Sequence, residues 1–525
     1  MIAASVAAAV AAQESGGFSA PEIDWAAIAP VVIVLGAAAI GVLVEAFAPI
    51  GARRPVQLTL VGVALVAAFL AVLAGAGTFE VVMSGAYAAD GPTRFLQGVV
   101  LAAGAVAALF MAERTVDPAG DAFAARASTV PGSDDERDFT TAGWLQTEVW
   151  PLLLFGIGGM MLFVAANDLL TMFVALEVMS LPLYLLTGMA RRRRLLSQEA
   201  AMKYFILGAF SSAFFIYGAA LLYGFAGSVE LGVIAEKLSA QPGQNGLVLA
   251  GAAVLLVGML FKVAAVPFHS WTPDVYQGAP TVVTGFMAAG VKVAAFGALL
   301  RVVYVSLAGV QWDITPVLLV VATLTFFVGS VVALSQSDMK RMLAYSSIAH
   351  AGFLLLGVAA VSRAGLASTM FYLAAYAFAT LGAFAIISLV RDSNGEASKL
   401  TQWAGLGRRS PLTAAAFALF LLAFAGIPLT SGFIGKFSVF SASVAAGDAL
   451  AVVLAVIASA IAAFFYARVI VLMFFSEPQG DDVRVVIPSA FTAVGLGVTV
   501  AATVVLGVFP QPLLDLAQQA DLFVR

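Results

Sequence analysis

The sequence predicts an all-α polytopic membrane protein with about fourteen transmembrane helices. Of its 525 residues, 62% are hydrophobic and only 11% are charged, whereas a soluble domain has roughly 25% charged residues. A chain of this composition cannot cover a water-facing surface. Long runs without charge recur along it, and about twenty helical residues cross the hydrocarbon core of a bilayer. The length of the chain therefore indicates the number of membrane spans rather than the number of soluble domains.

Fourteen runs of the sequence are long enough to span. They lie at 26–48, 56–76, 95–112, 148–166, 167–190, 199–226, 247–268, 277–307, 314–335, 340–361, 366–390, 411–444, 447–475 and 485–509. The run 411–444 is too long for one straight span and contains Gly426, Pro428 and Gly432. Because proline removes a helical hydrogen bond, we expect a broken helix there.

Positively charged loops indicate the orientation. One side carries Arg53, Arg54, Arg114, Arg126, Arg137, the run Arg191 to Arg194, Lys340, Arg341, Arg391, Lys399, Arg408, Arg409 and Arg484. The other side carries Arg94, Lys237, Arg363 and Arg525. Since loops rich in lysine and arginine stay on the inner side, we expect both termini outside. The arginine run 191–194 is then a topology signal, and a contact with lipid or a partner is the alternative.

Composition also narrows the function. The net charge of −4 indicates no nucleic-acid partner. The sequence has no cysteine, which excludes cysteine-ligated iron–sulfur clusters, thiol catalysis and disulfides on this chain, and its two histidines are too few for the usual histidine-rich metal or haem site. The stretch 1–17 lacks the basic region of a signal peptide, so we expect a short, weakly ordered extension, with a cleaved signal as the alternative. The polar loop 113–147 has no periodicity, and we expect it to be mobile or docked on a partner.

Five of the ionisable residues inside the predicted spans are the candidate site residues, namely Glu177, Lys203, Lys262, Lys292 and Lys436. A lysine at the centre of a transmembrane helix costs about 2.5–3.5 kcal/mol on insertion scales. A partner acid, internal water or loss of the proton must relieve this cost, and a lysine that loses its proton near neutral pH can relay protons. Lys203 lies near the start of its span, so snorkelling to the headgroups is the alternative for it. A structural ion pair is the alternative for the others.

The segment 258–276, GMLFKVAAVPFHSWTPDVY, places Lys262, Pro267 and His269 close together. In a helix, Pro267 removes the hydrogen bond to the carbonyl of Val263, and broken backbone in a membrane lines a polar cavity. Lys262 and His269 are seven residues apart, so an unbroken helix would put them on one face about 10 Å apart. We therefore expect His269 to carry protons beside Lys262. The alternative is that His269 caps the broken helix end.

The segment AGIPLTSGFIGKF repeats this device, with Pro428 and glycines upstream of Lys436. The first break lies near the seventh span and the second near the twelfth, so the offset is five helices. An odd offset requires the two copies to be inverted in the membrane. The organisation of the chain therefore predicts an internal inverted repeat.

These segments carry a family resemblance. The stretch PFHSWTPDVYQGAPTVVTGFMAAGVKVAAFG resembles the antiporter-like subunits of NADH:quinone oxidoreductase (respiratory complex I) and of Mrp-type sodium/proton antiporters. SDMKRMLAYSSIAHAG and AGIPLTSGFIGKF look most like the subunit N group, called NADH dehydrogenase subunit 2 in mitochondria. The resemblance covers roughly residues 148–475. Lysine at position 436 favours subunit N over subunit M, which usually has glutamate there.

The resemblance implies fourteen helices, inverted five-helix repeats at helices 4–8 and 9–13, discontinuous helices 7 and 12, and a proton route along the membrane midplane. The matching division of the chain is 1–147, 148–307, 308–475 and 476–525. The resemblance further implies proton-transfer roles for Glu177, Lys203, Lys262, Lys292 and Lys436, supporting roles for His269 and His350, the recurring histidines of helices 7 and 10, and breaks at Pro267 and Pro428.

The function expected from this resemblance is proton translocation by a membrane subunit of NADH:quinone oxidoreductase, with Glu177 paired to Lys203 or Lys262. FMN, iron–sulfur clusters and quinone are expected on partner subunits, with no cofactor on this chain. The expected partners are the neighbouring antiporter-like subunit M, the small subunits K and J, and the lipids of a bacterial plasma membrane. Three alternatives stay open: a subunit of an Mrp-type cation/proton antiporter, a quinone-reducing membrane subunit, and a passive scaffold, which would leave four buried lysines unexplained.

Overall fold

The computed structural model describes residues 23–117, 120–240, 246–392, 395–478 and 483–524. Within them, eleven helices are long and apolar enough to cross a membrane. They are α2 (Trp25–Phe47), α3 (Ile50–Ala74), α4 (Gly91–Met111), α7 (Leu169–Thr187), α8 (Arg194–Ala226), the composite helix Thr281–Ser306, Ala308–Leu334 with α14 (Gln311–Leu334), α15 (Met339–Ala359), α16 (Arg363–Leu389), α20 (Ala449–Phe475) and α21 (Ala490–Val508). The expected N-terminal extension lies outside the described residues.

Three further crossings are shorter or interrupted. They are α6 (Val149–Ala165), α10 (Gly246–Lys262) continued by α11 (Trp271–Gly278), and α18 (Pro411–Ala425) continued by α19 (Ser431–Ala445). Together with the eleven long helices they make the predicted fourteen crossings of a polytopic membrane protein. Three of the starts differ from the approximate predicted boundaries by five or six residues, since α3 begins at Ile50, α8 at Arg194 and α21 at Ala490, against 56, 199 and 485. A helix continues past the hydrocarbon edge when its basic residues find polar partners, as Arg54 does by donating to the Ala112 carbonyl.

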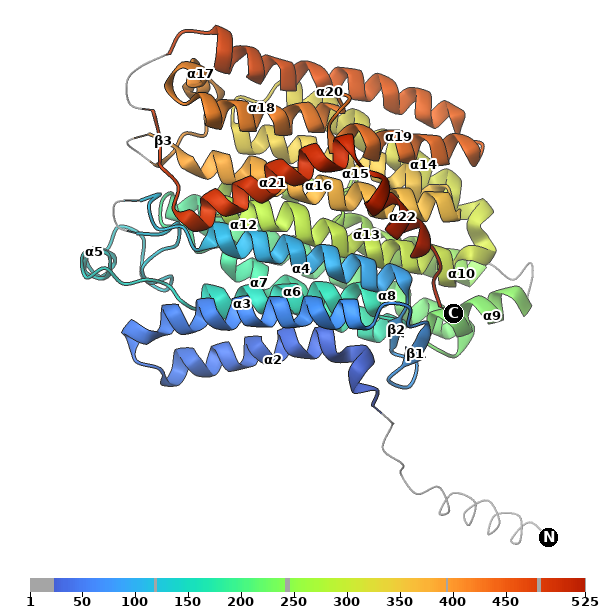
Figure 1. The fold of residues 1–525 in the computed structure, drawn as a ribbon. Coiled ribbons are helices and arrows are strands. Elements are labelled where there is room, and N and C mark those ends of the chain that lie inside the picture. Colours follow the sequence, from blue (N-terminus) through green and yellow to red (C-terminus); the bar gives the residue numbers. More distant parts are fainter. Residues whose placement is uncertain (1–22, 118–119, 241–245, 393–394, 479–482, 525) are drawn as a thin grey trace, which may run out of the picture.

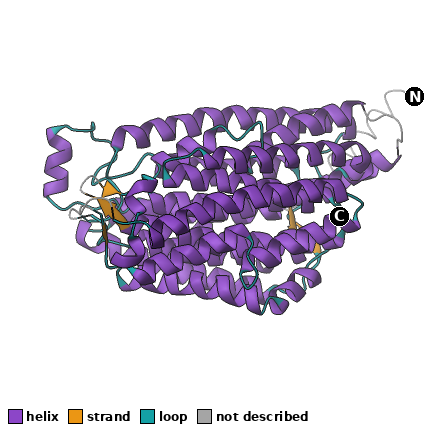
Figure 2. Ribbon diagram, turned by 90° about the horizontal axis from the view of Figure 1, so that it is seen from above, coloured by secondary structure: helices purple, strands orange, loops and turns teal. Residues whose placement is uncertain are grey.

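The crossings lie side by side in an elongated bundle, and the strands of the described residues lie at its two ends (Figures 1 and 2). One end carries α5 (Asp134–Thr141), η4 (Leu400–Trp403), α17 (Leu406–Arg409) and an antiparallel sheet in the order β4 (Gly395–Glu396), β3 (Val390–Asp392), β5 (Arg484–Val485). The opposite end carries the antiparallel pair β1 (Glu80–Val82) and β2 (Tyr87–Ala89), with α9 (Leu231–Ala240) and α22 (Gln511–Gln519).

The centre of the bundle is formed by three crossings. Within an apolar stretch of 18 residues in each helix, the share of buried residues is 100% for the composite helix Thr281–Ser306 and 94% for both α15 and α16. It is only 33% for α20 and 28% for α21. The composite helix is irregular. It consists of α12 (Thr281–Phe286), the π-helix η1 (Met287–Val291), α13 (Lys292–Arg301) and the π-helix η2 (Val302–Ser306), and the 3-10 turn η3 (Ala308–Val310) follows.

The first broken helix differs from the expectation drawn from Pro267. Helix α10 already ends at Lys262, so Pro267 lies in a non-helical connection to α11 and does not remove a helical bond to Val263. Protein groups satisfy this broken backbone. The Val266 amide donates to the Thr325 hydroxyl over 2.9 Å, and the Trp271 indole donates to the Phe261 carbonyl over 3.0 Å. The break therefore needs partners from α14 and α11, as membrane-buried backbone requires.

The second broken helix is confirmed at the predicted place. Helix α18 ends at Ala425, and Gly426 follows with a φ of +80°, a left-handed conformation that glycine adopts without strain. Pro428 lies in the connection, and α19 starts at Ser431. The two halves approach closely, since a Cβ atom on Gly432 would lie 1.8 Å from the Ala423 carbonyl oxygen.

The two interruptions occupy equivalent places in the order of helices. The first falls in the fourth crossing of helices 4–8, which run from α6 to η2, and the second in the fourth crossing of helices 9–13, which run from α14 to α20. The lysines, however, do not correspond. Lys262 ends the first half of its broken helix, whereas Lys436 lies in the second half of the other. The division of the chain at 147, 307 and 475 falls between crossings and stays a prediction.

The described part of the loop 113–147 is docked on the chain's own arginine run, while the expectation that the loop is mobile or docked on a partner stays a prediction. Arg191 donates to the Asp121 carboxylate over 2.9 Å, and Arg192 binds both carboxylate oxygens of Asp117. Arg194 donates to the Ala127 carbonyl. Burial raises the pKa of the Asp121 carboxyl, and the charge of Arg191 opposes that shift. The run therefore holds a loop in addition to any role in topology.

Candidate functional site

Lys262 lies at the end of α10 with only 3% of its surface exposed. Its Nζ donates to the Ser180 hydroxyl over 2.8 Å and to the Tyr184 hydroxyl over 3.3 Å. The rings of Tyr184, Tyr204 and Phe261 have their centroids 5.6, 6.0 and 5.8 Å from this nitrogen. Hydroxyl acceptors and aromatic faces therefore stabilise a charge that has no carboxylate beside it within the described residues.

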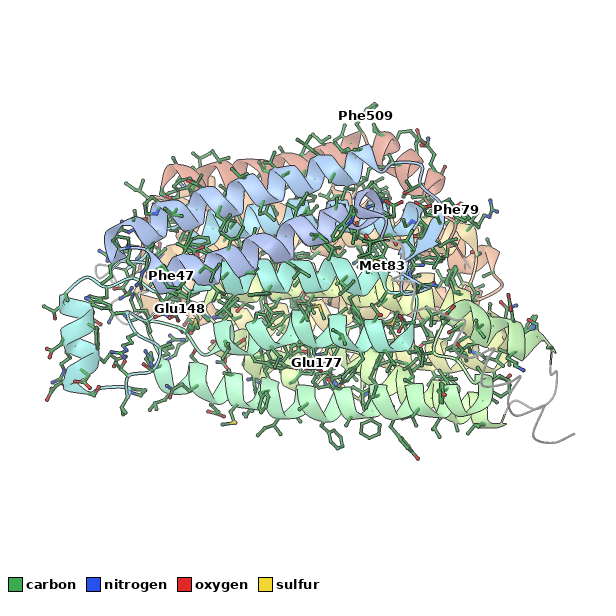
Figure 3. The ribbon with its side chains drawn as sticks, turned by 90° about the horizontal axis from the view of Figure 1, so that it is seen from below. Phe47, Phe79, Met83, Glu148, Glu177 and Phe509 are labelled. Atoms are coloured by element: carbon green, nitrogen blue, oxygen red, sulfur yellow. The ribbon has the colours of Figure 1, made fainter. Side chains whose placement is uncertain are left out.

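Glu177 is on the same face of α7 as the groups that bind Lys262. Residues 177, 180 and 184 are three and four apart, the spacing of one helix face. The carboxylate of Glu177 accepts a hydrogen bond from Ser212 on α8. Figure 3 places it about midway along the bundle, between the end with Phe47 and the end with Met83. The expected ion pair with Lys203 or Lys262 is wrong for this structure, because within the described part of the chain Glu177 pairs with neither lysine.

Lys203 is the one predicted site lysine with acidic partners among the described residues. Its Nζ lies 2.7 Å from Asp274 on α11 and 2.8 Å from Glu199 one turn earlier on α8. Arg341 binds the other oxygen of Asp274 at 2.7 Å. The Lys203 side chain is 42% exposed, so this cluster lies at the flank of the bundle. Lys203 thus joins α8 to the second half of the first broken helix.

Lys292 lies at the start of α13, in the fully buried centre of the bundle. Its Nζ donates to the carbonyl of Ser347 on α15 and, over 2.7 Å, to the hydroxyl of the same residue. The ring centroid of Tyr376, on α16, lies 5.1 Å from the nitrogen. The π-helix that precedes Lys292 carries an extra residue in its turn, and this sets the direction in which the lysine leaves the helix.

His350 lies one turn beyond Ser347 on α15 and is 1% exposed. Its Nδ1 lies 2.6 Å from the Tyr372 hydroxyl on α16, and its Nε2 lies 3.4 Å from the Tyr466 hydroxyl on α20. Tyr466 also hydrogen bonds to Ser346 at 2.5 Å. Hydroxyl groups from α16 and α20 therefore contact one imidazole on α15, close to the residue that binds Lys292.

Lys436 joins the two halves of the second broken helix. From α19, its Nζ donates to the carbonyls of Phe424 and Ala425 at the end of α18, over 2.9 and 3.1 Å, and to the Ser459 hydroxyl on α20 over 2.8 Å. The last carbonyls of a helix lack partners within it and carry partial negative charge. The Phe424 ring also packs on His350, with ring centroids 5.6 Å apart. Phe424 therefore contacts both Lys436, through its carbonyl, and His350, through its ring.

His269 is separated from this array. The break between α10 and α11 removes the shared helix face expected for Lys262 and His269. His269 is half-buried, and its ring packs against Tyr345 with centroids 6.5 Å apart. The imidazole also interacts with the backbone of Pro267. These contacts differ from the partners of Lys262, and both the proton-carrying role and the alternative, that His269 caps the broken helix end, stay predictions.

Sequence comparison identifies the family. A family described as NADH:quinone oxidoreductase/Mrp antiporter, TM, matches residues 166–462. NADH-quinone oxidoreductase subunit N of Rhodococcus opacus is 58% identical over 531 residues, which cover 98% of this chain and 98% of that protein. Subunit N of Mycobacteroides abscessus is 54% identical, covering 97% and 99%. The chain belongs to the subunit N family. The predicted family is thereby confirmed.

Solved structures agree with the fold of this subunit N family member. A chain of respiratory complex I from Thermus thermophilus is 32% identical, with a TM-score of 0.74, and the match covers 93% of this chain and 99% of that one. A chain of the Mrp complex from Dietzia sp. DQ12-45-1b has a TM-score of 0.77 at 22% identity, covering 95% and 97%. At that identity the second match shows the fold alone.

Sequence reasoning missed several residues of this family member. It did not find Asp274 beside Lys203, the tyrosines around Lys262 and His350, or the pairing of Arg301 with Asp90. Arg94, assigned to an outer loop, lies in α4, is 6% exposed and donates to the Ala27 carbonyl. The sequence signal that could have identified these residues is their polar character within apolar runs. Across the described residues, no cluster of three histidine or acidic side chains is placed to hold a metal ion.

Proposed function

We propose that this subunit N family member is a proton-translocating membrane subunit of an NADH-quinone oxidoreductase. Its own residues move protons, and partner subunits carry out the redox chemistry with FMN, iron–sulfur clusters and quinone. Family membership supports the assembly, and the buried array from Lys262 to Lys436 supports the activity. Three intramembrane lysines bound by hydroxyls, carbonyls and aromatic rings are difficult to account for as a packing device alone.

The observation that carries the proposal is the link between Lys292 and Lys436 through α15. Ser347 binds Lys292, and His350 one turn later faces Phe424, whose carbonyl binds Lys436. The groups in this region that can carry protons are the two lysines, the Ser347 hydroxyl and the His350 imidazole, and the contact between His350 and Phe424 is one between rings. Hydroxyls, imidazoles and amines exchange protons when their hydrogen bonds rearrange.

Glu177 provides the electrostatic coupling in this mechanism. Glu177 lies one turn from Ser180, which binds Lys262, so a change in the charge or position of this carboxylate would change the electrostatic potential along the route from Lys262 toward Lys292. Redox events in partner subunits would act by changing which of these groups are charged, a coupling free energy between distant sites. Lys203 belongs to the same route through Asp274 and α11.

The arginine-rich end of the bundle is assigned to the inner side of a bacterial plasma membrane, so the first and last crossings have their free ends outside. The neighbouring subunits in the proposal are the antiporter-like subunit M and the small subunits K and J, with membrane lipids around them. No cofactor is proposed on this chain. The fold of the Mrp chain from Dietzia sp. favours one second candidate, a cation/proton antiporter subunit. The chains that co-purify separate the two.

Lys262 offers the sharpest test. In complex purified with its native neighbours, Lys262→Met should assemble and oxidise NADH but lose redox-linked proton pumping. Lys262→Arg should also pump poorly, because arginine stays protonated and cannot release its proton. The exposed Lys237→Met on α9 is the matched control and should behave as wild type. Normal proton pumping by both Lys262 variants would contradict the proposal. So would purification of this chain with its native neighbours if no redox subunit were among them.

A further inference from the structure

Asp90 and Arg301 form an ion pair with 0% of either side chain exposed. Arg301 binds the carboxylate with both terminal nitrogens, at 2.9 and 2.8 Å. It also donates to the Val164 carbonyl and the Thr93 hydroxyl. Asp90 is the N-cap of α4, and its Oδ1 accepts a further bond from the Thr93 amide. A buried ion pair persists only when its remaining donors and acceptors are satisfied in this way.

Residues 511–524 complete this pair. The Val524 amide donates to Asp90 Oδ2 over 3.1 Å, so each carboxylate oxygen accepts two hydrogen bonds. The Phe523 ring centroid lies 4.7 Å from the guanidinium carbon of Arg301. Helix α22 packs against α4 and α16. The fit is close, since a Cβ atom on Gly91 would lie 2.7 Å from the Ala520 Cα.

The pair lies at the far end of the helix that carries Lys292. Helix α13 has ten residues, with Lys292 first and Arg301 last, so it separates the two by about 14 Å. A π-helix adjoins each end of α13, and the hydrogen bonds of such irregular turns differ from the α pattern on either side. Helix α13 is therefore a regular rod between two irregular junctions. It packs against α6, α4 and α16, and polar side-chain contacts hold its two ends, namely Ser347 at Lys292 and Asp90 at Arg301.

We propose that Asp90 and Arg301 are positioning residues for Lys292, and that residues 511–524 are a latch that keeps the pair closed. The inference rests on the proposed role of Lys292 in proton transfer. With the latch docked, α13 is fixed and Lys292 stays on Ser347. When the latch is released, Asp90 loses one hydrogen bond and Arg301 loses its aromatic cover. Water then reaches the pair, and α13 shifts between its two π-helical junctions.

Two glycines on α4 give a matched test. Gly91→Ala inserts a methyl group where the latch backbone passes, whereas Gly98→Ala meets only a Phe69 ring carbon at 3.9 Å, an ordinary contact. Both variants are studied in the assembled complex by hydrogen–deuterium exchange. Gly91→Ala should speed exchange within residues 292–306 roughly tenfold, the factor expected from losing one charge-assisted hydrogen bond. Gly98→Ala should leave exchange unchanged. If Gly91→Ala fails to assemble, Phe523→Ala, which removes the aromatic cover of Arg301 and a ring contact with Tyr304, decides the result.

Proton pumping then tests the positioning role. The variant with faster exchange should oxidise NADH normally but translocate fewer protons per electron. Unchanged exchange in both Gly91→Ala and Phe523→Ala would overturn the latch. Faster exchange with an unchanged proton-to-electron ratio would overturn the positioning role. Failure of the proposed function is distinguishable, because pumping would then also survive Lys262→Met and Lys262→Arg, while the exchange measurement still reports on the latch.

Discussion

The ammonium of Lys436, on the second half of a broken helix, lies 2.9 Å from the carbonyl oxygen of Phe424 on the first half. That carbonyl belongs to the last turn of α18, where no helical amide is available and the helix end is partially negative. One side chain therefore joins the two half-helices through an amine that can also carry a proton. A change in its protonation would change the junction between α18 and α19 as well.

Substitution of Lys436 separates these two roles. Lys436→Met removes the charge and the cap, so redox-linked pumping should be lost. Lys436→Arg keeps a charged donor near the carbonyls but cannot release a proton, so the complex should assemble while pumping stays low. Pumping is measured as acidification driven by NADH in membrane vesicles, with Lys237→Met as the control. Wild-type pumping by Lys436→Arg would show that capping, rather than proton release, is the function of this lysine.

The effect of the charge on Glu177 can be separated from the effect of the hydrogen bond that its carboxylate accepts from Ser212. Glu177→Gln keeps the shape and removes the charge, so the proton-to-electron ratio should fall while assembly is retained. Ser212→Ala keeps the charge and removes only a neutral hydrogen-bond donor, so its effect should be small. The two ratios are compared at equal rates of NADH oxidation. Equal losses in both variants would indicate that the hydrogen bond, and not the charge on Glu177, is what matters.

The sequence was sufficient for the crossings and for most of the polar residues within them. A charged residue inside an apolar run is visible in the sequence itself, so Lys262, Lys292 and Lys436 could be identified without knowing which residues surround them in the fold. The partners that each side chain binds depend on the fold and could not be identified in this way. Asp90 and Arg301 are 211 residues apart, and no periodicity connects them. Pro267 was misinterpreted because a proline predicts that a helix ends but not how many residues earlier.

The docking of loop 113–147 is a testable consequence of the arginine run. Arg191→Gln removes two hydrogen bonds from Asp121 and should weaken local docking by on the order of 2–3 kcal/mol. Cleavage after Glu136 by a glutamyl endopeptidase should then become faster. Arg137→Gln is the control, because the side chains of Arg137 and Asp134 are 73% and 92% exposed and such pairs contribute little. Equal cleavage rates in both variants would mean that the loop is held by other contacts.

Glu113 should make the packing of the last crossing sensitive to acid. Its carboxylate accepts the amides of Thr115 and Ser489, the residue before α21. Burial alone would raise the pKa of Glu113, but the hydrogen bonds to the carboxylate outweigh it and lower the pKa to about 2. A carboxyl whose pKa is lower in the folded state stabilises that state above its unfolded pKa of about 4.3. This contribution is lost as the pH falls from about 4.3 toward 2. Thermal unfolding of the purified protein should therefore lose stability over that range.

Two glutamine variants test whether the loss of stability in acid comes from the carboxylate of Glu113. Glu113→Gln cannot titrate, so it should be less stable than wild type at pH 7 by roughly 1–3 kcal/mol, the cost of replacing charged with neutral hydrogen bonds at a buried site. The difference from wild type should shrink between pH 4.3 and 2, because the wild-type carboxyl becomes neutral as well. Glu80→Gln, at an exposed position on β1, should follow the wild-type curve throughout. A difference between Glu113→Gln and wild type that stays constant down to pH 2 would show that packing of the carboxamide, and not the charge of Glu113, determines the stability at the start of α21.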